Sequence, residues 1–224
     1  MKDLVIFDFC ETLSTFQTAD KFVSYVLSDK EIKKSKFWVL ISRFLGNRYF
    51  SIFFNKFFPE YNYGKRMRLL SLRKVKASDL DKLAISYNAY LQKNLITPLY
   101  KKMLKHISNE DHVIIISGGY DTYIQCFAEE HGIEHVCATK IKIKNKISTG
   151  TFDGLDCMHN EKLIKVKRYI ESKQLKYKES IFYTDSISDL ILMKWVDEGI
   201  VISKNKPQKW AKEYGFKEII WKES

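Results

Sequence analysis

The sequence predicts an α/β fold in which a parallel sheet is covered by helices on both faces and interrupted by a helical insert. After Pro98, short apolar and β-branched segments alternate with helical stretches, which is the pattern of a parallel sheet. Between Thr18 and about Leu95, apolar residues instead recur at spacings of three and four, which is typical of helices. The chain of 224 residues, 45% of them hydrophobic, is long enough for one large domain or a domain with an insert.

The N-terminal part contains one expected strand followed by the insert. Residues 4–9 form a short apolar run that ends in acidic and polar residues, as a buried strand does. We expect four or five helices in the insert, with a break near Pro59 and Gly64, and we expect Pro98 to mark the return to the sheet. The expected division is residues 1–13 plus 98–224 for an α/β core domain and 14–97 for a helical domain.

The remaining elements follow in regular alternation. The expected strands are residues 112–116, 135–139, 180–184 and 199–202, with 219–221 as a last edge strand. The expected helices are residues 99–107, 120–131, 162–172 and 187–196. Between residues 140 and 151, Lys alternates with Ile around Asn145, which predicts a small hairpin with one face in solvent.

Positive charge is concentrated in the insert. The chain has 38 Lys and Arg against 27 Asp and Glu, a formal net charge of +11. Residues 14–97 hold 16 of these basic residues and only 6 of the acidic ones, so nearly the whole excess lies there. This distribution suits the attraction of a small anionic metabolite. We expect no nucleic-acid partner, because no nucleic-acid recognition motif accompanies the charge.

The cysteines and the apolar stretches favour a cytoplasmic protein. The four cysteines lie far apart and form no CxxC pair, as expected for reduced thiols. The apolar run at the N-terminus is too short for a secretory signal. The most apolar later stretch, residues 37–58, is interrupted by Arg43, Arg48 and Lys56 and does not reach the roughly 18 apolar residues of a membrane span. We therefore expect no transmembrane segment.

Polar side chains follow three of the expected strands. In a parallel α/β sheet, ligands bind beyond the carboxyl ends of the strands. The first strand ends in DFCETL, which begins at Asp8, the second ends in SGG from Ser117, and the fourth ends in TDSISD from Thr184. Lys162 begins the helix before that fourth strand. Together these segments supply carboxylates for a hard cation, a hydroxyl and glycine amides for an anion, and one ammonium group.

Each of these residues also has an ordinary structural interpretation. Asp8 alone is consistent with a helix N-cap, and Ser117 with its glycines is consistent with a tight turn. Asp185 and Asp189 are consistent with a solvated helix start. Their joint occurrence at strand ends and at one helix start, within a single α/β pattern, favours a phosphate-binding site instead.

With these motifs in this order, the sequence resembles the haloacid dehalogenase superfamily, and most closely its phosphoserine-phosphatase-like branch. FDFCETL resembles the first motif of the family, IIISGG the second and NEKLIKV the third, and YTDSISDL is similar to the fourth, acidic motif. The resemblance covers the whole chain. It implies a Rossmann-like parallel sheet, with the helical insert as a cap that closes over the active site.

The resemblance implies a nucleophile and a magnesium site. Asp8 would attack the phosphorus in line and form an aspartyl-phosphate, with Mg²⁺ bridging its other oxygen and the phosphate. Asp185 would be the second carboxylate ligand, and the backbone carbonyl of Cys10 the third protein ligand. Asp189 would bind a metal-bound water or orient the site.

The resemblance also implies a phosphate-binding set. Ser117, with the amide of Gly118 and the adjoining Gly119, would hold phosphate oxygens. Lys162 would neutralise the nucleophile and the charge that develops on the phosphoryl group. Thr12 would form hydrogen bonds around the first loop.

Two positions depart from the family pattern, and the first concerns proton transfer. The phosphatases of this family place an aspartate two residues after the nucleophile, where it protonates the leaving group and then activates water; Cys10 stands there in this chain. A thiol with a pKa of about 8.5 is a poor donor and is only slightly ionised at neutral pH. Four explanations remain open: a leaving group that needs no acid, Glu11 as the proton carrier, slow catalysis by the cysteine, or an inactive protein.

The second departure concerns the substrate. Phosphoserine phosphatases carry a glutamate nine residues after the nucleophile, which holds the ammonium group of the substrate, whereas this chain has Gln17. The absence of that charge argues against phosphoserine, unless Gln17 is only an ordinary residue of the cap hinge. We expect a small phosphomonoester whose non-phosphate end is neutral or differently charged.

The sequence therefore predicts a magnesium-dependent phosphatase that acts on a small phosphomonoester through an aspartyl-phosphate. The competing hypothesis is a catalytically weakened protein of the same fold that docks on an anionic membrane surface or partner. It rests on the many Phe residues and the basic residues of the stretch 37–58, a mixture seen in interfacial helices. The plainer explanation is that these aromatic side chains pack the helices of the insert against one another.

Overall fold

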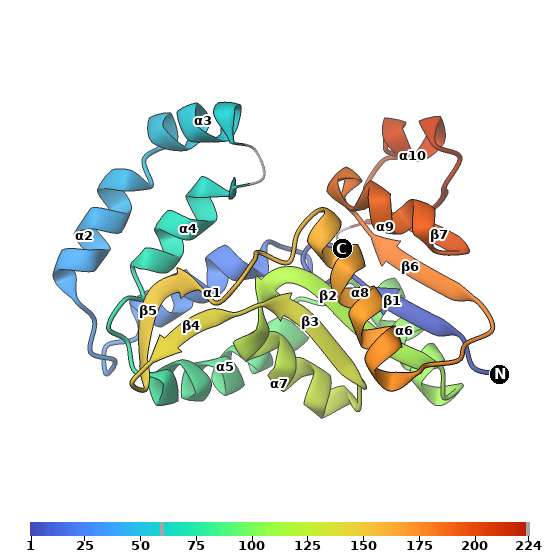
Figure 1. Cartoon of the computed structure of the whole chain (residues 1–224), viewed down its shortest axis with the longest axis horizontal. Coiled ribbons are helices and arrows are strands. Elements are labelled where there is room, and N and C mark those ends of the chain that lie inside the picture. Colours follow the sequence, from blue (N-terminus) through green and yellow to red (C-terminus); the bar gives the residue numbers. More distant parts are fainter. Residues whose placement is uncertain (59–60, 223–224) are drawn as a thin grey trace.

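The computed structural model describes residues 1–58 and 61–222, so the expected break at Pro59 lies outside the described residues. Within these ranges the main sheet has six strands. They are β1 (Leu4–Phe7), β2 (His112–Tyr120), β3 (His135–Thr139), β6 (Ser180–Thr184), β7 (Glu198–Lys204) and β8 (Lys217–Trp221). The strands lie in the order β3-β2-β1-β6-β7-β8, and each neighbouring pair is parallel, which confirms the predicted parallel sheet (Figure 1).

The register of β1 with its two neighbours brings the polar strand ends together. All four side chains of β1 are buried, because Val5 and Phe7 face one hydrophobic core and Leu4 and Ile6 face the other. Phe7, the last residue of β1, pairs with Ile115 of β2 and with Tyr183 of β6, so these three residues lie at the same level. The residues that follow Phe7, Ile115 and Tyr183 are therefore neighbours in space, although β2 itself continues to Tyr120.

Helices cover both faces of the sheet. The face that carries Val5 and Phe7 is covered by α6 (Thr97–Ser108) and α7 (Asp121–His131). The face that carries Leu4 and Ile6 is covered by α8 (Asn160–Lys173), α9 (Leu190–Trp195) and α10 (Lys209–Glu213). A short 3₁₀ helix, η2 (Ile187–Asp189), precedes α9. The five residues of α10 are too few to show a helical period, which is why the sequence did not predict this helix.

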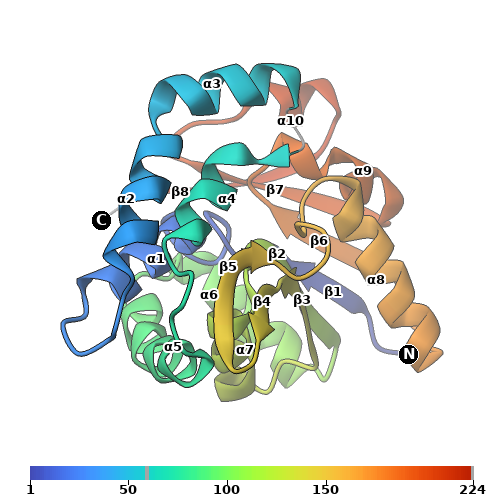
Figure 2. The same cartoon turned by 60° about the vertical axis from the view of Figure 1, so that its left-hand side comes forward.

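The insert contributes five helices in its described part, within the predicted range of four or five. They are α1 (Thr18–Ser28), α2 (Lys36–Leu45), α3 (Arg48–Phe57), α4 (Tyr63–Leu70) and α5 (Ala77–Gln92). The rings of Phe22 on α1 and Tyr87 on α5 lie 5.3 Å apart, and both also contact Tyr123 of α7, so this half of the insert shares the main core. In both views α2 and α3 lie at the outer edge of the molecule (Figures 1 and 2).

The predicted hairpin is present and is joined to the insert. It consists of β4 (Ile141–Lys144) and β5 (Ile147–Phe152), which pair antiparallel. The backbone of the insert extends this pairing, since the amides of Lys74 and Ala77 donate to the carbonyls of Ser148 and Lys146, both at 2.9 Å. Gly150, with φ +71°, allows α4 to approach β5 closely, because a Cβ there would lie 3.1 Å from the backbone of Leu70.

No helix in the two described ranges is both long enough and apolar enough to cross a lipid bilayer.

Candidate active site

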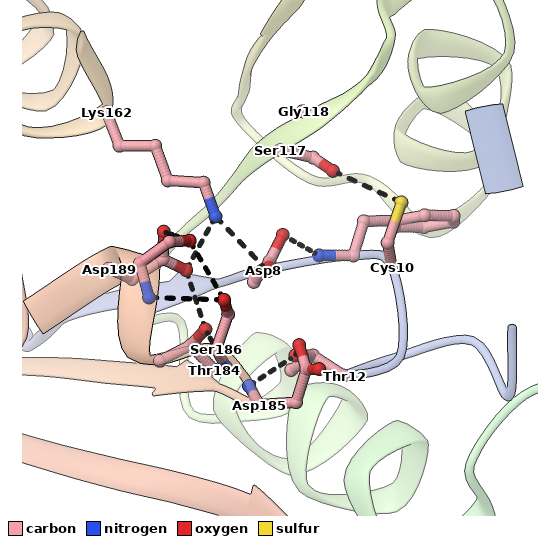
Figure 3. Close-up of polar contacts among 12 residues, drawn as sticks. Asp8, Cys10, Thr12, Ser117, Gly118, Lys162, Thr184, Asp185, Ser186 and Asp189 are labelled. Atoms are coloured by element: carbon pink, nitrogen blue, oxygen red, sulfur yellow. Dashed lines mark hydrogen bonds and ion pairs between the residues drawn. The ribbon is translucent and has the colours of Figure 1, made fainter. Parts of the chain in front are cut away.

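The aligned ends of β1 and β6 hold the two carboxylates that the sequence singles out. Asp8 follows β1, and its amide donates to the carbonyl of Tyr183 in β6 at 2.9 Å. Asp185 follows β6, where its Oδ1 accepts from the hydroxyl of Thr12 at 3.1 Å and its amide donates to the same hydroxyl at 3.0 Å. Thr12 thus links the loop after β1 to the loop after β6 (Figure 3).

Lys162 joins Asp8 to Asp189. Its Nζ lies 2.7 Å from Asp189 Oδ2 and 3.1 Å from Asp8 Oδ2, and only 1% of the lysine is exposed (Figure 3). Asp189 Oδ2 also accepts from the Thr184 hydroxyl at 2.6 Å. Burial alone would lower the pKa of Lys162, but the Asp189 and Asp8 carboxylates raise it above its usual value. Lys162 is therefore a fixed positive charge, and Asp189 acts as its anchor in this structure.

The remaining charge at the site is not balanced. Burial raises the pKa of Asp8 to about 6, although Lys162 opposes this shift. Burial, together with the charges of Asp8 and Glu11, raises the pKa of Asp185 to about 8. The ionised forms of both Asp8 and Asp185 are therefore disfavoured. A cation between the two carboxylates would offset this penalty, so the site favours cation binding.

The donor set fits Mg²⁺ in particular. Mg²⁺ is commonly held by one or two protein carboxylates, with water and substrate phosphate completing its coordination. Asp8 and Asp185 supply the two carboxylates, and both line the same pocket. Among residues 1–58 and 61–222, no group of three or more His, Cys, Asp or Glu side chains could hold a metal ion by itself. The third protein ligand that the family resemblance implies is the backbone carbonyl of Cys10.

The SGG segment lies at the same edge of the sheet. Ser117 is fully buried, and its Oγ accepts from the amide of Gly119 at 3.0 Å. Gly118 lines the pocket, whereas Gly119 faces away from it, because a Cβ on Gly119 would collide with Tyr123 and Ile124. Gly118 is thus the glycine of this pair that a ligand in the pocket can reach.

Cys10 occupies a buried hydrogen-bonded position. Its Sγ lies 2.9 Å from Thr18 Oγ1 and 3.8 Å from Ser117 Oγ, and Thr18 Oγ1 in turn lies 2.6 Å from Tyr123 Oη. Burial, reinforced by the negative charge of Asp8, raises the pKa of the Cys10 thiol above its ordinary value. Cys10 is therefore a neutral thiol at physiological pH and has no charge with which to activate water.

These residues open into a pocket of about 400 Å³ between the strand ends and the insert. Its walls include Asp8, Cys10, Glu11, Gln17, Asp20, Lys65, Arg68, Gly118, Met158, Lys162 and Asp185. The sequence pointed to seven of the residues in these walls: Asp8, Cys10, Glu11, Gln17, Gly118, Lys162 and Asp185. The other four predicted residues, Thr12, Ser117, Gly119 and Asp189, lie behind the walls. Thr12 contacts Asp185, Asp189 contacts Lys162, and Ser117 and Gly119 bond to each other beside Gly118.

Lys65 is one of the wall residues that the sequence did not identify, together with Asp20, Arg68 and Met158. This lysine of α4 pairs with Asp156, donates to the Gly118 carbonyl and lies 3.2 Å from Thr139 Oγ1. Its Nζ also lies 4.9 Å from the centre of the Phe152 ring. Burial lowers the pKa of Lys65, while Asp156 opposes that shift. No motif marks Lys65 in the sequence, because its partners lie more than 50 positions away along the chain.

Two further polar pairs line the pocket. Arg68 of α4 forms an ion pair with Asp20 of α1. The Gln17 amide donates to the carboxylate of Glu11, which is one of the candidate proton carriers. Gln17 therefore orients the Glu11 side chain. Glu11 has φ +54°, a left-handed conformation in the turn that follows Asp8.

Solved structures with the same fold include phosphatases. A protein of unknown function from Bordetella pertussis Tohama I has a TM-score of 0.70 at 17% sequence identity, with 98% of each chain covered. A substrate-bound phosphoserine phosphatase has a TM-score of 0.65 at 16% identity, covering 98% of this chain and 93% of its own. Cytosolic 5′-nucleotidase IIIB bound to cytidine has a TM-score of 0.64 at 12% identity, covering 99% and 80%.

The comparison of sequences with curated proteins gives no match. The family model of the haloacid dehalogenase-like hydrolases, however, matches residues 5–194, a span that contains all four strand-end and helix-start motifs. The chain therefore belongs to the haloacid dehalogenase-like hydrolase family.

Proposed function

We propose that the protein is a magnesium-dependent phosphatase that hydrolyses a small phosphomonoester through an aspartyl-phosphate on Asp8. The observation that carries this proposal is the Asp8, Lys162 and Asp185 cluster at the wall of one pocket, with Lys162 Nζ 3.1 Å from Asp8 Oδ2. Family membership and the likeness to phosphatase and nucleotidase folds support a phosphoric monoester hydrolase.

In this proposal a carboxylate oxygen of Asp8 attacks the phosphorus, and the bond to the alcohol oxygen breaks. Lys162 keeps Asp8 ionised and offsets the charge on the phosphoryl oxygens. The amide of Gly118 binds phosphate oxygens, and Ser117, buried behind the wall, positions this segment through its bond with the Gly119 amide. Water then attacks the phosphorus to release inorganic phosphate and regenerate Asp8. Mg²⁺, held by Asp8, Asp185 and the Cys10 carbonyl, would supply the positive charge that lets the carboxylates and the phosphate approach one another.

Proton transfer is the weak part of this site. The alcohol must gain a proton as it leaves, and the hydrolytic water must lose one. The Cys10 thiol is neutral and engaged with Thr18, so it is a poor donor and cannot serve as a base. We therefore propose an enzyme that is slow with ordinary alkyl esters or specialised for substrates whose leaving group needs little protonation.

The insert contributes to substrate recognition as a cap. We propose that residues 14–97 close one side of the pocket over the core formed by residues 1–13 and 98–224. Lys65 and Arg68 of α4 support this assignment, because both line the pocket that the strand ends form. Their charges suit an anionic substrate, while Gln17 supplies a neutral amide where phosphoserine would need a carboxylate.

The proposal is tested by measuring phosphate release from a panel of phosphomonoesters, with MgCl₂ or with EDTA. Asp8→Asn should abolish release, and EDTA should abolish it reversibly in the unmodified protein. Asp153→Asn, which removes an exposed carboxylate of the same type, is the matched control and should keep full activity. Unchanged phosphate release by the Asp8→Asn variant would show that Asp8 is not the nucleophile.

A further inference from the structure

Helices α2 and α3 carry a continuous apolar surface that faces solvent. Its members are spaced three and four residues apart on each helix, and between 41% and 68% of each is exposed. We define the outer face as Phe37, Leu40, Phe44, Phe50, Phe53 and Phe57. The rings of Phe44 and Phe50 lie 6.1 Å apart, so the stripe on α2 continues into the stripe on α3.

Packing within the insert accounts for other aromatic residues but not for the outer face. Trp38 of α2 packs under Arg73, whose guanidinium carbon lies 4.2 Å from the centre of its ring. Phe54 of α3 stacks on Tyr63 of α4 with ring centres 4.4 Å apart. These inward contacts attach α2 and α3 to the rest of the insert. The side chains of the outer face are instead largely exposed, and α2 and α3 lie at the edge of the molecule in both views (Figures 1 and 2).

The positive charge around the outer face indicates the kind of partner that it binds. Residues 36–58 contain four Lys or Arg and no Asp or Glu, and among them Arg43 and Lys56 are exposed on α2 and α3. A second copy of the chain would bring the same positive charge against this surface. An anionic lipid surface offers both the apolar phase that exposed Phe side chains enter and the negative charge that the basic residues attract.

We propose that the outer face docks on the anionic surface of a lipid bilayer, with α2 and α3 lying in the interface. Each helix has 10 residues and is about 15 Å long, which suits a position along the surface. The Phe and Leu side chains would enter the headgroup and acyl boundary, and Arg43 and Lys56 would contact lipid phosphates. This docking goes beyond the proposed phosphatase activity and does not depend on it.

The first test is co-sedimentation with vesicles of 30% phosphatidylglycerol in phosphatidylcholine, compared with phosphatidylcholine alone. We expect binding to the anionic vesicles at low salt and weaker binding at high salt. The double variant Leu40→Ser/Phe53→Ser should lose at least about tenfold in affinity, because two large apolar side chains no longer leave water. The matched control, Ile85→Ser/Ile191→Ser, removes two exposed apolar side chains elsewhere and should bind as the unmodified protein does.

The second test separates insertion from simple attraction of charges. With brominated lipid in anionic vesicles, a Phe44→Trp variant should gain fluorescence quenching, whereas Ile85→Trp should not. The proposal is overturned if the protein ignores anionic vesicles at low salt, or if the control double variant loses as much affinity as the outer-face variant. It is also overturned if vesicles are not bound and the outer-face substitutions instead abolish self-association in sedimentation velocity.

These results are independent of catalysis. The Asp8→Asn variant should bind vesicles normally, and the outer-face variants should hydrolyse a soluble phosphomonoester normally. A failure of lipid binding would therefore leave the phosphatase proposal standing, and the reverse holds as well.

Discussion

Cys10 is the side chain of the site that most affects the proposed proton transfer. It stands where the resembling phosphatases have an acid-base aspartate, and the structure surrounds it with Thr18, Ser117 and the buried Asp8 carboxylate; burial and the charge of Asp8 keep it a neutral thiol. General acid-base groups typically contribute about 100-fold to 10,000-fold to a rate. We therefore expect the cysteine to affect mainly the turnover rate, because other groups of the site bind the phosphate and the cation.

The effect of Cys10 is measured by restoring the carboxylate. Cys10→Asp should raise kcat for an alkyl phosphate by at least about tenfold and raise it less for an aryl phosphate, whose leaving group needs less protonation. Cys10→Asn, which is nearly isosteric with Asp but cannot carry the proton, is the control and should give no gain. If neither ester is hydrolysed faster by the Cys10→Asp variant, proton transfer at this position does not limit the enzyme.

The two pocket carboxylates predict how stability depends on pH. The ordinary pKa of an aspartate is 3.8, whereas burial raises the pKa of Asp8 to about 6 and that of Asp185 to about 8. Between about pH 4 and pH 8 the folded protein therefore holds protons that the unfolded chain has lost. By linkage, the metal-free protein becomes less stable as pH rises through this window.

Urea unfolding in EDTA from pH 5 to pH 8 measures this dependence. Asp185→Asn should flatten the loss of stability between about pH 6 and pH 8, because its side chain cannot ionise, while the exposed-site control Asp153→Asn should keep it. Mg²⁺ should stabilise the unmodified protein most at the higher pH. An unchanged slope in the Asp185→Asn variant would contradict the assignment of a buried, charge-penalised carboxylate at position 185.

At the residue scale, the sequence predicted the groups that lie at strand ends and missed the group that a remote helix supplies. Asp8 and Asp185 follow strands, Ser117 lies in the last part of β2, and parallel strands bring such residues together by geometry alone. Lys65 reaches the pocket only because α4 packs on β5, and that packing depends on contacts between segments far apart in the chain. Local periodicity carries no information about such a contact.

Among the secondary-structure elements, α4 connects the insert to the rest of the site. Lys65 on this helix binds Asp156 and the Gly118 carbonyl, and both ends of the Lys65 and Asp156 pair are buried. Asp156 also accepts from Thr139 at 2.6 Å, so the pair belongs to a buried network that holds the insert against the pocket. A buried pair is costly to break, because the remaining charge loses its partner.

Removal of the lysine tests this connection. Lys65→Met should lower the free energy of unfolding by about 3 to 5 kcal/mol and should raise KM for an anionic substrate. The double variant Lys65→Met/Asp156→Asn should recover part of the stability, because no uncompensated charge is then buried. Lys82→Met, which breaks the exposed Lys82 and Glu31 pair, is the control and should change stability little. Equal effects of the two lysine variants would show that the buried pair does not hold the insert.

The elements themselves were predictable where they are long and periodic. The sheet strands and the helices after residue 98 correspond to the expected alternation, but β2 continues to Tyr120 where the sequence predicted an end at residue 116. The glycines at 118 and 119 read as a turn signal, yet they stay in the strand because β3 pairs on either side of them, with Ser117 opposite Ala138 and Tyr120 opposite Thr139, and the register shifts between these two pairs. Partner strands thus overrode a local signal.

For the whole molecule, the distribution of charge follows the division into core and insert. The insert carries nearly all of the +11 net charge, and the structure places part of it at the pocket, on Lys65 and Arg68, and part beside the outer face, on Arg43 and Lys56. Composition alone indicates an anionic partner, and the fold divides that charge between the pocket that we propose binds substrate and the outer face that we propose docks on lipid. Both assignments use the same helical insert.

The most direct test of the central claim is to trap the phosphoryl group on the protein. A substrate labelled with ³²P is mixed with the unmodified protein and MgCl₂, the reaction is quenched in acid during turnover, and the label is located by peptide mapping. In the proposed mechanism Cys10 slows the attack of water, so we expect an alkali-labile label on Asp8, and less of it in the Cys10→Asp variant. Phosphate release with the label absent from Asp8, or with the label on Cys10, would contradict the account.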